Sequence, residues 1–296
     1  MQLGALLPLG DIGGEPAVLR EYAQAAEAAG YHFLEAPDHV MGANPASRPN
    51  DERAGAGYYQ DPFVLFGYLA GVTLKLGFST GVLILPQRQT ALVAKQAACL
   101  DVLCGGRFRL GIGVGWNEVE FIGLNENFHN RGRRSEEQVQ VMKALWGNEY
   151  VAFKGRWHTL DDAGISPRPP SGSVPVWYGG HVEQTLQRVA KWGDGWMPNA
   201  YPPDQSALDV FGQLRKLTEQ AGRDPGKVGI EVWVSMGSGN EADWARDAKF
   251  WKSAGATHLC LTTTFNRRHH KRIAGHSIGD HIAALRRYQR AVAEAL

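Results

Sequence analysis

The sequence lacks net charge, paired cysteines and long apolar runs, and each absence excludes a class of protein. With 31 basic and 30 acidic residues its formal charge is +1, so no overall field attracts nucleic acid or a membrane surface. The three cysteines, Cys99, Cys104 and Cys260, include no C-x-x-C pair, which argues against a disulfide framework and a structural zinc site. These absences favour a soluble protein that acts on a small-molecule substrate and binds no metal.

The beginning of the chain shows no targeting signal. Its first residues, MQLGALLPLGD, include no basic residue and run directly into a strand-like pattern. No apolar run approaches the ~18 residues that a membrane-spanning helix needs. We therefore expect a cytoplasmic protein with neither a membrane partner nor a nucleic-acid partner.

The sequence does contain a regular alternation of strand-like and helix-like segments. Short apolar runs predict strands over 2–8, 31–37, 75–86, 105–115, 174–180, 193–198, 227–234 and 257–263. A 3.6-residue period predicts helices over 16–29, 63–72, 90–103, 135–147, 183–191, 204–221 and 241–253, and a last helix carrying Ile278 to Val292. Gly30 is expected to end the first helix, and Ser135 with Gln138 to form a capping box at the start of the fourth.

Strands that alternate with helices run parallel and are joined by right-handed crossovers, and eight such units close naturally into a barrel. We therefore predict an α/β fold, a (β/α)8 TIM barrel that forms a single domain over residues 1–296. An open doubly wound sheet is the alternative, because periodicity does not show closure. Two insertions interrupt the pattern: a Gly/Pro/Asn-rich loop over 40–60 after strand two, either a lid or a surface loop, and a hairpin over 149–160 before strand five.

The most informative stretch is GGRFRLGIGVGWNEVEF, residues 105–121. Gly111, Gly113 and Gly115 recur with a period of two, so they share one face of an extended strand and leave room for a flat group against the main chain. The spacing differs from the dinucleotide fingerprint G-x-G-x-x-G, and no long helix follows to receive a pyrophosphate. This stretch predicts a ligand at the end of a strand in another kind of fold.

Asp38 and His39 stand where the second predicted strand ends, on the face where barrel active sites form. Imidazole exchanges a proton near neutral pH, so His39 is a candidate general acid or base. The alternative is that Asp38 hydrogen-bonds the following loop while His39 only packs.

Other strand ends add candidates on the same face. A glycine interrupts the apolar run around Thr80, Gly81 and Val82, which indicates a bulge, a close ligand approach or relief of crowding. Gly179 and Gly180 open a helix in VWYGGH, which suits either an anion site or a plain turn. Asn117 and Glu118 either orient a ligand edge or, for Asn117, cap a short helix in NEVEF.

Several other patterns are set aside. The basic run HNRGRR at 129–134 is typical of solvated surface before a helix. His269, His270 and His276 have no carboxylate or thiol at metal-ligand spacing, which disfavours a metal site. The chain has no G-x-S-x-G elbow and no Walker-type phosphate loop, which weakens acyl transfer and nucleotide hydrolysis.

With these motifs in place, the chain resembles the luciferase-like monooxygenase superfamily, in particular its branch of deazaflavin (F420)-dependent oxidoreductases. The resemblance covers nearly the whole chain. It rests on Asp38-His39, on GVLILPQRQTALVAKQAACLDVLCGGRFRLGIGVGWNEVEF (81–121), on RGRRSEEQVQVMKALW (131–146), and on VPVWYGGH followed by GDGWMP.

The resemblance implies a flavin-like ring at the carboxyl face of the barrel, with His39 and Asp38 as catalytic residues and a non-proline cis peptide at Gly81-Val82. It implies a cofactor site made of Thr80, Gly81, Val82, Gly113, Val114, Gly115, Asn117, Tyr178, Gly179, Gly180 and His181, with the phosphate near the last three. The implied activity is hydride transfer between C5 of F420 and an unknown small organic substrate. Alternatives are an FMN-dependent two-component monooxygenase and a non-catalytic flavin-binding barrel; a homodimer and a separate flavin or F420 reductase are the implied protein partners.

Overall fold

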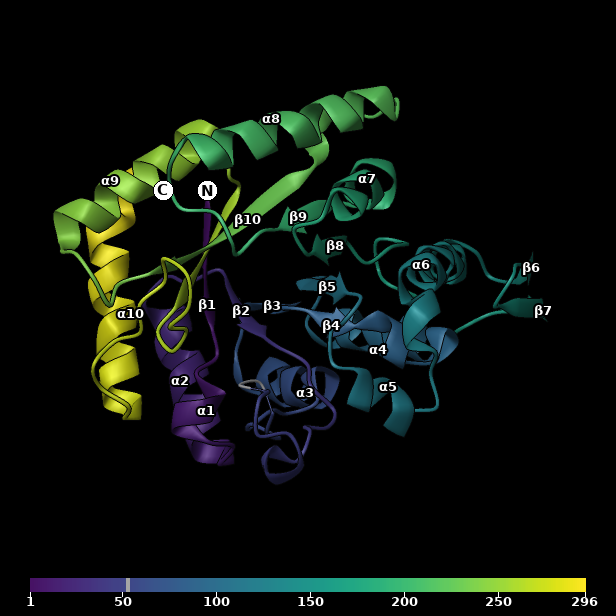
Figure 1. Cartoon of the computed structure of the whole chain (residues 1–296), viewed down its shortest axis with the longest axis horizontal. Helices are drawn as coiled ribbons and strands as arrows, with labels where there is room; N and C mark the ends of the chain where they lie inside the picture. Colours follow the sequence, from purple (N-terminus) through teal and green to yellow (C-terminus); the bar gives the residue numbers. More distant parts are fainter. Residues whose placement is uncertain (52–53) are drawn as a thin grey trace.

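The computed structural model describes residues 1–51 and 54–296 and shows a closed barrel of parallel strands inside a layer of helices (Figure 1). The barrel order is β1-β2-β3-β5-β8-β9-β10-β11, and β11 pairs with β1 to close it. The barrel strands are β1 (Gln2–Leu6), β2 (Phe33–Ala36), β3 (Gly77–Thr80), β5 (Phe108–Gly113), β8 (Val176–Gly179), β9 (Gly195–Met197), β10 (Gly229–Ser235) and β11 (His258–Thr262). Closure confirms the predicted (β/α)8 TIM barrel and excludes the open doubly wound sheet.

Each barrel strand is followed by a long helix on the outer surface (Figure 1). These are α2 (Pro16–Ala28), α3 (Pro62–Val72), α4 (Thr90–Leu103), α6 (Arg131–Gly147), α7 (Glu183–Trp192), α8 (Gln205–Gln220), α9 (Glu241–Ala254) and α10 (Ile278–Val292). Shorter elements are α1 (Leu9–Ile12), β4 (Leu83–Ile84) and α5 (Glu118–Gly123). Short 3-10 turns cover Pro45–Ser47, Leu85–Gln87, Phe128–Asn130, Pro225–Lys227 and Ala293–Ala295. Within the described residues, no helix combines the length and apolarity needed to cross a membrane.

Local sequence explains where several helices begin. Asp61 caps α3 by accepting hydrogen bonds from the backbone N–H groups of Phe63 and Val64, with Pro62 at the first helical position. Ser277 and Asp280 form a reciprocal capping box at the start of α10. Such caps satisfy backbone donors that have no partner inside the helix.

The predicted start of α6 was wrong. This helix begins at Arg131, and the Ser135 hydroxyl donates to the carbonyl of Gly132 inside it, 2.8 Å away. The Arg131 guanidinium stacks on Phe128 at 3.7 Å from the ring centre, while Arg134 pairs with Glu126 and is nearly buried. These contacts extend the helix backwards over the basic run that we expected to be solvated surface.

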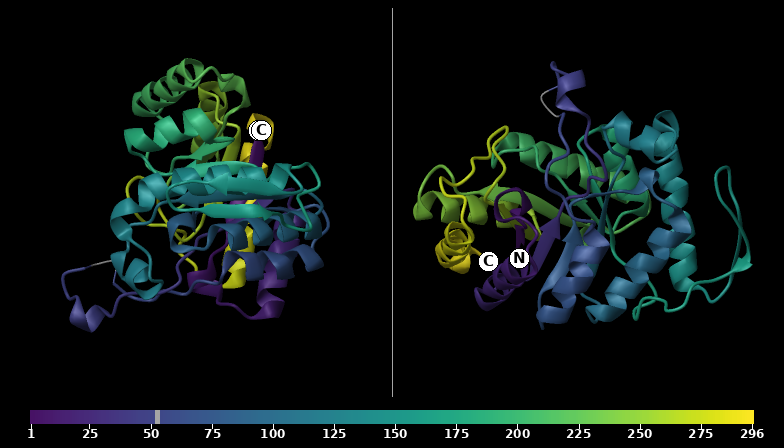
Figure 2. Two further views of the ribbon diagram at one scale, coloured as in Figure 1. Left: turned by 90° about the vertical axis from the view of Figure 1, so that its right-hand side faces the viewer. Right: turned by 90° about the horizontal axis from the view of Figure 1, so that it is seen from below.

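The two predicted insertions are both present as chain excursions. β6 (Val151–Lys154) and β7 (Thr159–Ala163) form the expected antiparallel hairpin between α6 and β8. The segment after β2 extends away from the barrel (Figure 2), and the expectation for 40–60 falls outside the described residues at positions 52 and 53. Met1 and Leu296 meet, with the terminal ammonium donating to the Leu296 carbonyl at 3.2 Å (Figure 1).

The barrel interior is built around one arginine. The Arg109 guanidinium lies 4.5 Å from the ring centre of Phe33 and 4.2 Å from the ring of Trp177, a cation–π arrangement on both sides. The barrel makes room for these rings by lacking side chains at the positions that face them: Gly4 opposite Phe33, and Gly195 and Gly229 opposite Trp177. The amino-terminal part of the barrel is therefore filled, and open space is left at the carboxyl end.

Candidate active site at the carboxyl end of the barrel

A cavity of about 210 Å³ opens at the carboxyl ends of β3, β5 and β8. Its lining includes predicted site residues from all three strand ends: Gly81, Val82, Gly113, Val114, Gly115, Gly179, Gly180 and His181. It also includes residues that the sequence did not single out, among them Glu35, Ile84 and Trp233. The strand ends that were predicted from separate motifs thus surround one cavity.

The peptide bond between Gly81 and Val82 is cis, as the resemblance implied. It places the Val82 side chain between two glycines: Val82 Cγ2 lies 2.5 Å from where a β-carbon on Gly113 would be, and Cγ1 lies 2.7 Å from that position on Gly179. The interpretation of period-two glycines as a bare face for a flat ligand therefore needs correction. Gly113 and Gly179 first make room for Val82, and Gly111 makes room for the Thr80 carbonyl of the neighbouring strand.

His39 is not part of the cavity lining, but it lies next to Trp116, which is. Its Nδ1 is 3.2 Å from Oε1 of Glu120, a carboxylate on α5 that is only 1% exposed. The His39 ring makes an edge contact with Trp116, which lines the cavity, and a tilted contact with Tyr59, at centroid distances of 5.9 and 4.7 Å. When Nδ1 carries the hydrogen and donates it to Glu120, Nε2 is left as the proton-accepting atom.

Glu120 is fixed from several sides. Its carboxylate accepts from the backbone N–H groups of Val40 and Met41 and from the Gln87 amide. Burial alone would raise the pKa of Glu120, but the hydrogen bonds from His39, Gln87 and Met41 outweigh it and hold the pKa below its usual range. Glu120 therefore remains a carboxylate that orients His39 and anchors the loop after it.

Asp38 is not part of the cavity lining. Its buried carboxylate receives two hydrogen bonds from Arg88, at 2.8 and 3.3 Å, and one from the backbone N–H of Ile84 at 3.1 Å. Arg88 also reaches Asp61 at the cap of α3. This geometry favours the alternative considered for Asp38, that it anchors neighbouring chain, and a direct catalytic role stays a prediction.

Three predicted cofactor residues are close to the cavity without being part of its lining. The Thr80 hydroxyl donates to the Gly111 carbonyl at 2.6 Å, and Tyr178 is buried with no partner for its hydroxyl among the described residues. Asn117 stands at the start of α5, yet its amide donates to the Met41 carbonyl and makes no cap bond, so the capping expectation was wrong. These hydrogen bonds direct the polar groups of Thr80 and Asn117 to the backbone of neighbouring chain rather than to the ligand space.

The rim next to β8 collects hydrogen-bond donors. Arg268 donates toward Nε2 of His181 and to Oδ1 of Asn199, both at 3.3 Å. Burial and the Arg268 cation lower the pKa of His181, so its ring is neutral at pH 7. Because Nε2 then accepts from Arg268, Nδ1 carries the ring hydrogen, and this buried atom has no partner among residues 1–51 and 54–296. These donors suit an anion, and the anion-site alternative considered for Gly179 and Gly180 stays a prediction.

Comparison with known proteins decides the family. The model of the luciferase-like monooxygenase family matches residues 4–294, almost the entire chain. The chain belongs to the luciferase-like monooxygenase family.

Relatives of this luciferase-like protein differ in the activity that their names give. An uncharacterized protein of Mycobacterium tuberculosis (strain ATCC 25618 / H37Rv) is 35% identical over 68% of this chain and 71% of its own length. The F420-dependent hydroxymycolic acid dehydrogenase of the same organism is 28% identical over 79% of this chain and 63% of its own. The pyrimidine monooxygenase RutA of Allorhizobium ampelinum (strain ATCC BAA-846 / DSM 112012 / S4) is 33% identical over 56% and 47%.

Solved structures agree on the fold. An F420-dependent secondary alcohol dehydrogenase, solved with an F420-acetone adduct, is similar with a TM-score of 0.74 and 21% identity over 98% of both chains. The EDTA monooxygenase EmoA of Chelativorans sp. BNC1 is similar with a TM-score of 0.69 and 16% identity, over 86% of this chain and 66% of its own. The family and its oxidoreductase character are thus shown, and a deazaflavin or flavin cofactor is supported.

Sequence reasoning missed several residues of this luciferase-like site. Glu35 and Glu231 carried a signal, because each is the one acidic residue of a largely apolar predicted strand. Glu120 and Arg268 carried no comparable signal, since their roles depend on contacts with residues far away in the chain.

Proposed function

We propose that this luciferase-like protein is an F420-dependent oxidoreductase that transfers a hydride between C5 of the deazaflavin and a small organic substrate. The observation that carries the proposal is a cavity whose mainly apolar wall at Gly81-Val82 and Gly113–Gly115 leads into the donor-rich rim of His181, Asn199 and Arg268. A flat heterocycle joined to an anionic tail matches this arrangement, with the ring against the apolar wall and the anion at the rim.

The residues present fit such a group. The wall offers backbone and small apolar side chains, which suit a ring face. At the rim, the guanidinium of Arg268 and the Nδ1–H of His181, which has no partner in the described part of the chain, supply donors for a phosphate. We propose that Gly179, Gly180, His181 and Arg268 hold this phosphate, and that the other predicted wall residues contact the ring.

The bound cofactor would supply the two-electron chemistry, and the protein supplies placement and proton exchange. Nε2 of His39 is the candidate atom for that exchange, because Glu120 accepts the hydrogen on Nδ1. Asp38 is a positioning residue, because its hydrogen bonds with Arg88 and with the backbone N–H of Ile84 fix the segment that carries His39.

Charge beyond the rim favours F420 over FMN. F420 continues past its phosphate into a chain of carboxylates, whereas FMN ends at its phosphate. Arg267, Arg268 and Lys271 are exposed on the loop after β11, and in the described part of the chain none of them pairs with a carboxylate. The similarity to an F420-dependent hydroxymycolic acid dehydrogenase supports the same choice.

A second candidate is an FMN-dependent two-component monooxygenase supplied by a separate reductase. The similarity to the pyrimidine monooxygenase RutA favours it, and the same cavity would serve. A non-catalytic flavin-binding barrel is the third candidate; the pairing of His39 with a buried carboxylate gives that reading no support.

Isotope transfer tests the proposed activity. Reduced F420 carrying deuterium at C5 is mixed with the protein and a panel of small carbonyl, imine and alkene compounds, and products are analysed by mass spectrometry. We expect one compound class to gain deuterium at carbon only when protein is present. Oxygen insertion with reduced FMN, and no deuterium transfer from F420, would instead establish the monooxygenase. Binding without turnover of either cofactor would establish the non-catalytic barrel.

A further inference from the structure

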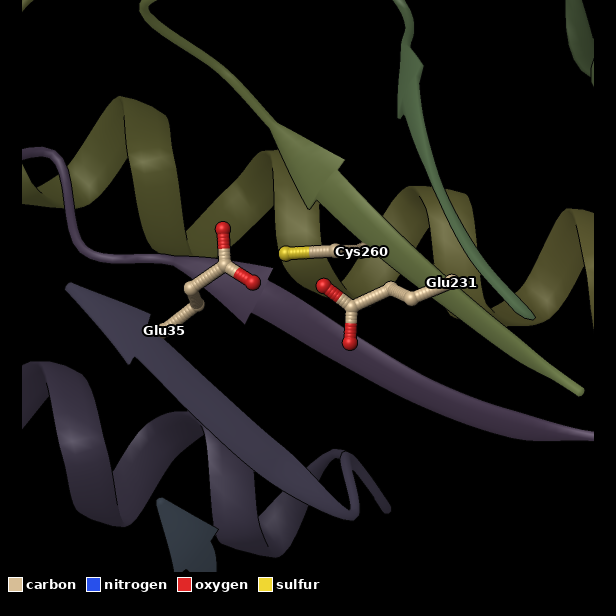
Figure 3. A group of neighbouring side chains, drawn as sticks. All are labelled: Glu35, Glu231 and Cys260. Carbon is tan, nitrogen blue, oxygen red and sulfur yellow. The ribbon is translucent and has the colours of Figure 1, made fainter. Parts of the chain in front are cut away.

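Two glutamates meet inside the barrel below the cavity. Glu35 on β2 and Glu231 on β10 are fully buried, and their carboxyl groups converge with the thiol of Cys260 on β11 (Figure 3). One ligand atom from each of the three side chains lies within 4.8 Å of the other two. Carboxyl groups are rarely buried without a compensating partner.

The partners of this pair are incomplete. Arg109 forms an ion pair with Oε2 of Glu231, and the Trp233 indole donates to Oε1 of Glu35 at 2.9 Å. The remaining oxygens, Oε2 of Glu35 and Oε1 of Glu231, are buried and have no partner among the described residues. Each glutamate thus has one satisfied oxygen and one unsatisfied oxygen.

A single proton shared by Glu35 and Glu231 would remove both the buried negative charge and the lack of partners for the two oxygens. Two carboxylates beside one guanidinium would leave a net negative charge in the barrel interior, where desolvation makes charge costly. One added proton neutralises that charge and turns two facing acceptors into a donor and an acceptor. Burial raises the pKa of Glu35 well above its usual range, and the neighbouring Glu231 raises it further against the opposing effects of Arg109 and Trp233.

Glu35 also reaches the ligand space. It lines the cavity directly beneath Gly81, where a β-carbon would overlap its carboxyl group. Among the described lining residues, Glu35 and His181 are the ones with ionisable side chains. A group bound over Gly81-Val82 therefore has Glu35 as its nearest carboxyl.

We propose that Glu35 and Glu231 share one proton and form a buried acid at the base of the cavity, which exchanges this proton with a ligand or water there. When the acid gives up its proton, the O–H bond of Glu35 breaks, the proton goes to a basic atom of the ligand or to water, and no electrons are transferred. Two carboxylates then remain beside Arg109. This role rests on the proposed function, since hydride transfer leaves a proton to be supplied or removed.

A divalent metal at the same three side chains is less well matched. Arg109 already supplies a cation to Glu231, and burial with the neighbouring carboxyls raises the pKa of the Cys260 thiol, which keeps it protonated. A protonated thiol is a poor metal ligand.

Infrared spectroscopy of the full-length protein tests for the proton. At pH 7 without ligand, we expect the carbonyl band of a protonated carboxyl that shifts in D2O and is absent from both Glu35→Gln and Glu231→Gln. Asp101→Asn is the matched control, because it removes another buried carboxyl whose pKa burial raises and which is outside the cavity lining. Absence of the band from the wild type, or its persistence in both Gln variants, would overturn the shared proton. A stoichiometric metal in the wild type that is lost from Glu35→Gln would do the same.

Ligand binding tests the exchange. Addition of F420, or of FMN, should shift this band or slow its D2O exchange in the wild type, while fluorescence reports binding separately. Bound ligand with an unmoved band and unchanged exchange refutes the exchange role and leaves the proposed function standing. If neither cofactor binds, the exchange role and the proposed function both fail, and the ligand-free band still decides the shared proton. Should Glu35→Gln fail to fold, Glu231→Gln and the D2O shift of the wild type give the same decision.

Discussion

Cγ2 of Val82 lies 2.5 Å from the position that a β-carbon on Gly113 would occupy, so the two residues fit together only because Gly113 has no side chain. Val82 follows the cis peptide at Gly81 and points its side chain between β5 and β8. Gly113 on β5 thereby sets how far the turn that carries Val82, between β3 and β4, can approach. The shape of the cavity wall depends on this pair.

We predict that Gly113→Ala weakens cofactor binding and destabilises the fold by about 1–3 kcal/mol, a typical cost of overpacking. The added methyl would displace Val82 into the ligand space. Gly10→Ala is the matched control, because nothing lies within 4 Å of its β-carbon position. Binding titration and thermal unfolding measure the two effects. Adding Val82→Ala should recover part of the stability lost by Gly113→Ala, and a strictly additive double variant would refute the steric link.

We predict that His39→Ala lowers kcat by about 10²- to 10⁴-fold, the usual contribution of a general acid or base, and retains cofactor affinity. Glu120→Gln should lower kcat less, because an amide oxygen still accepts the hydrogen on Nδ1 of His39. His129→Ala, which removes an exposed histidine on another loop, is the control and should match the wild type. Steady-state kinetics with a separate binding titration make the distinction. Unchanged turnover in His39→Ala would remove His39 from the mechanism.

We predict that Arg268→Ala weakens F420 binding by about 10-fold or more, since a hydrogen bond to a charged group contributes ~1.5–3 kcal/mol. Binding of the phosphate-free deazaflavin chromophore should not change, because it has no anion to contact the rim. Arg286→Ala on α10 is the control for loss of an exposed arginine. Equal weakening for both ligands would show that Arg268 does not bind the phosphate or the tail.

The buried acid predicts a pH dependence of stability. Because the pKa of Glu35 is raised in the folded state, its contribution is fully present below the ordinary glutamate pKa of 4.5 and is lost as pH rises toward the folded value. The free energy of unfolding should fall with rising pH in that window, by at most about 1.4 kcal/mol per pH unit for one proton. Urea unfolding of Glu35→Gln should lack this component of the slope. An identical slope in both proteins would contradict the assignment.

The alternation of strands and helices predicted the fold, and position at a strand end predicted most of the residues that line the cavity. Gly81, Gly113 and His181 could be predicted because parallel strands bring their carboxyl ends together. Residues that act through distant partners could not be predicted from local patterns, as with Arg88 holding Asp38 across 50 positions. The backward extension of α6 was missed because stacking of Arg131 on Phe128 is a tertiary contact.

The period-two glycines show the same limit. Their spacing indicated a strand face without side chains; Gly111 and Gly113 lie in β5, whereas Gly115 follows its end with a φ of 75°. What fills the space was decided by the Thr80 carbonyl at the end of β3 and by Val82 in the turn between β3 and β4. The spacing of glycines within one strand predicts where side chains are missing. Which group fills that space depends on how neighbouring segments pack, and the spacing does not show it.

Equilibrium titration of the purified protein with F420 and with FMN, followed by cofactor fluorescence, tests the central claim most directly. The account predicts saturable binding of F420 that is tighter than binding of FMN and is weakened by Gly113→Ala. Tight binding of FMN with no response to F420 would contradict it.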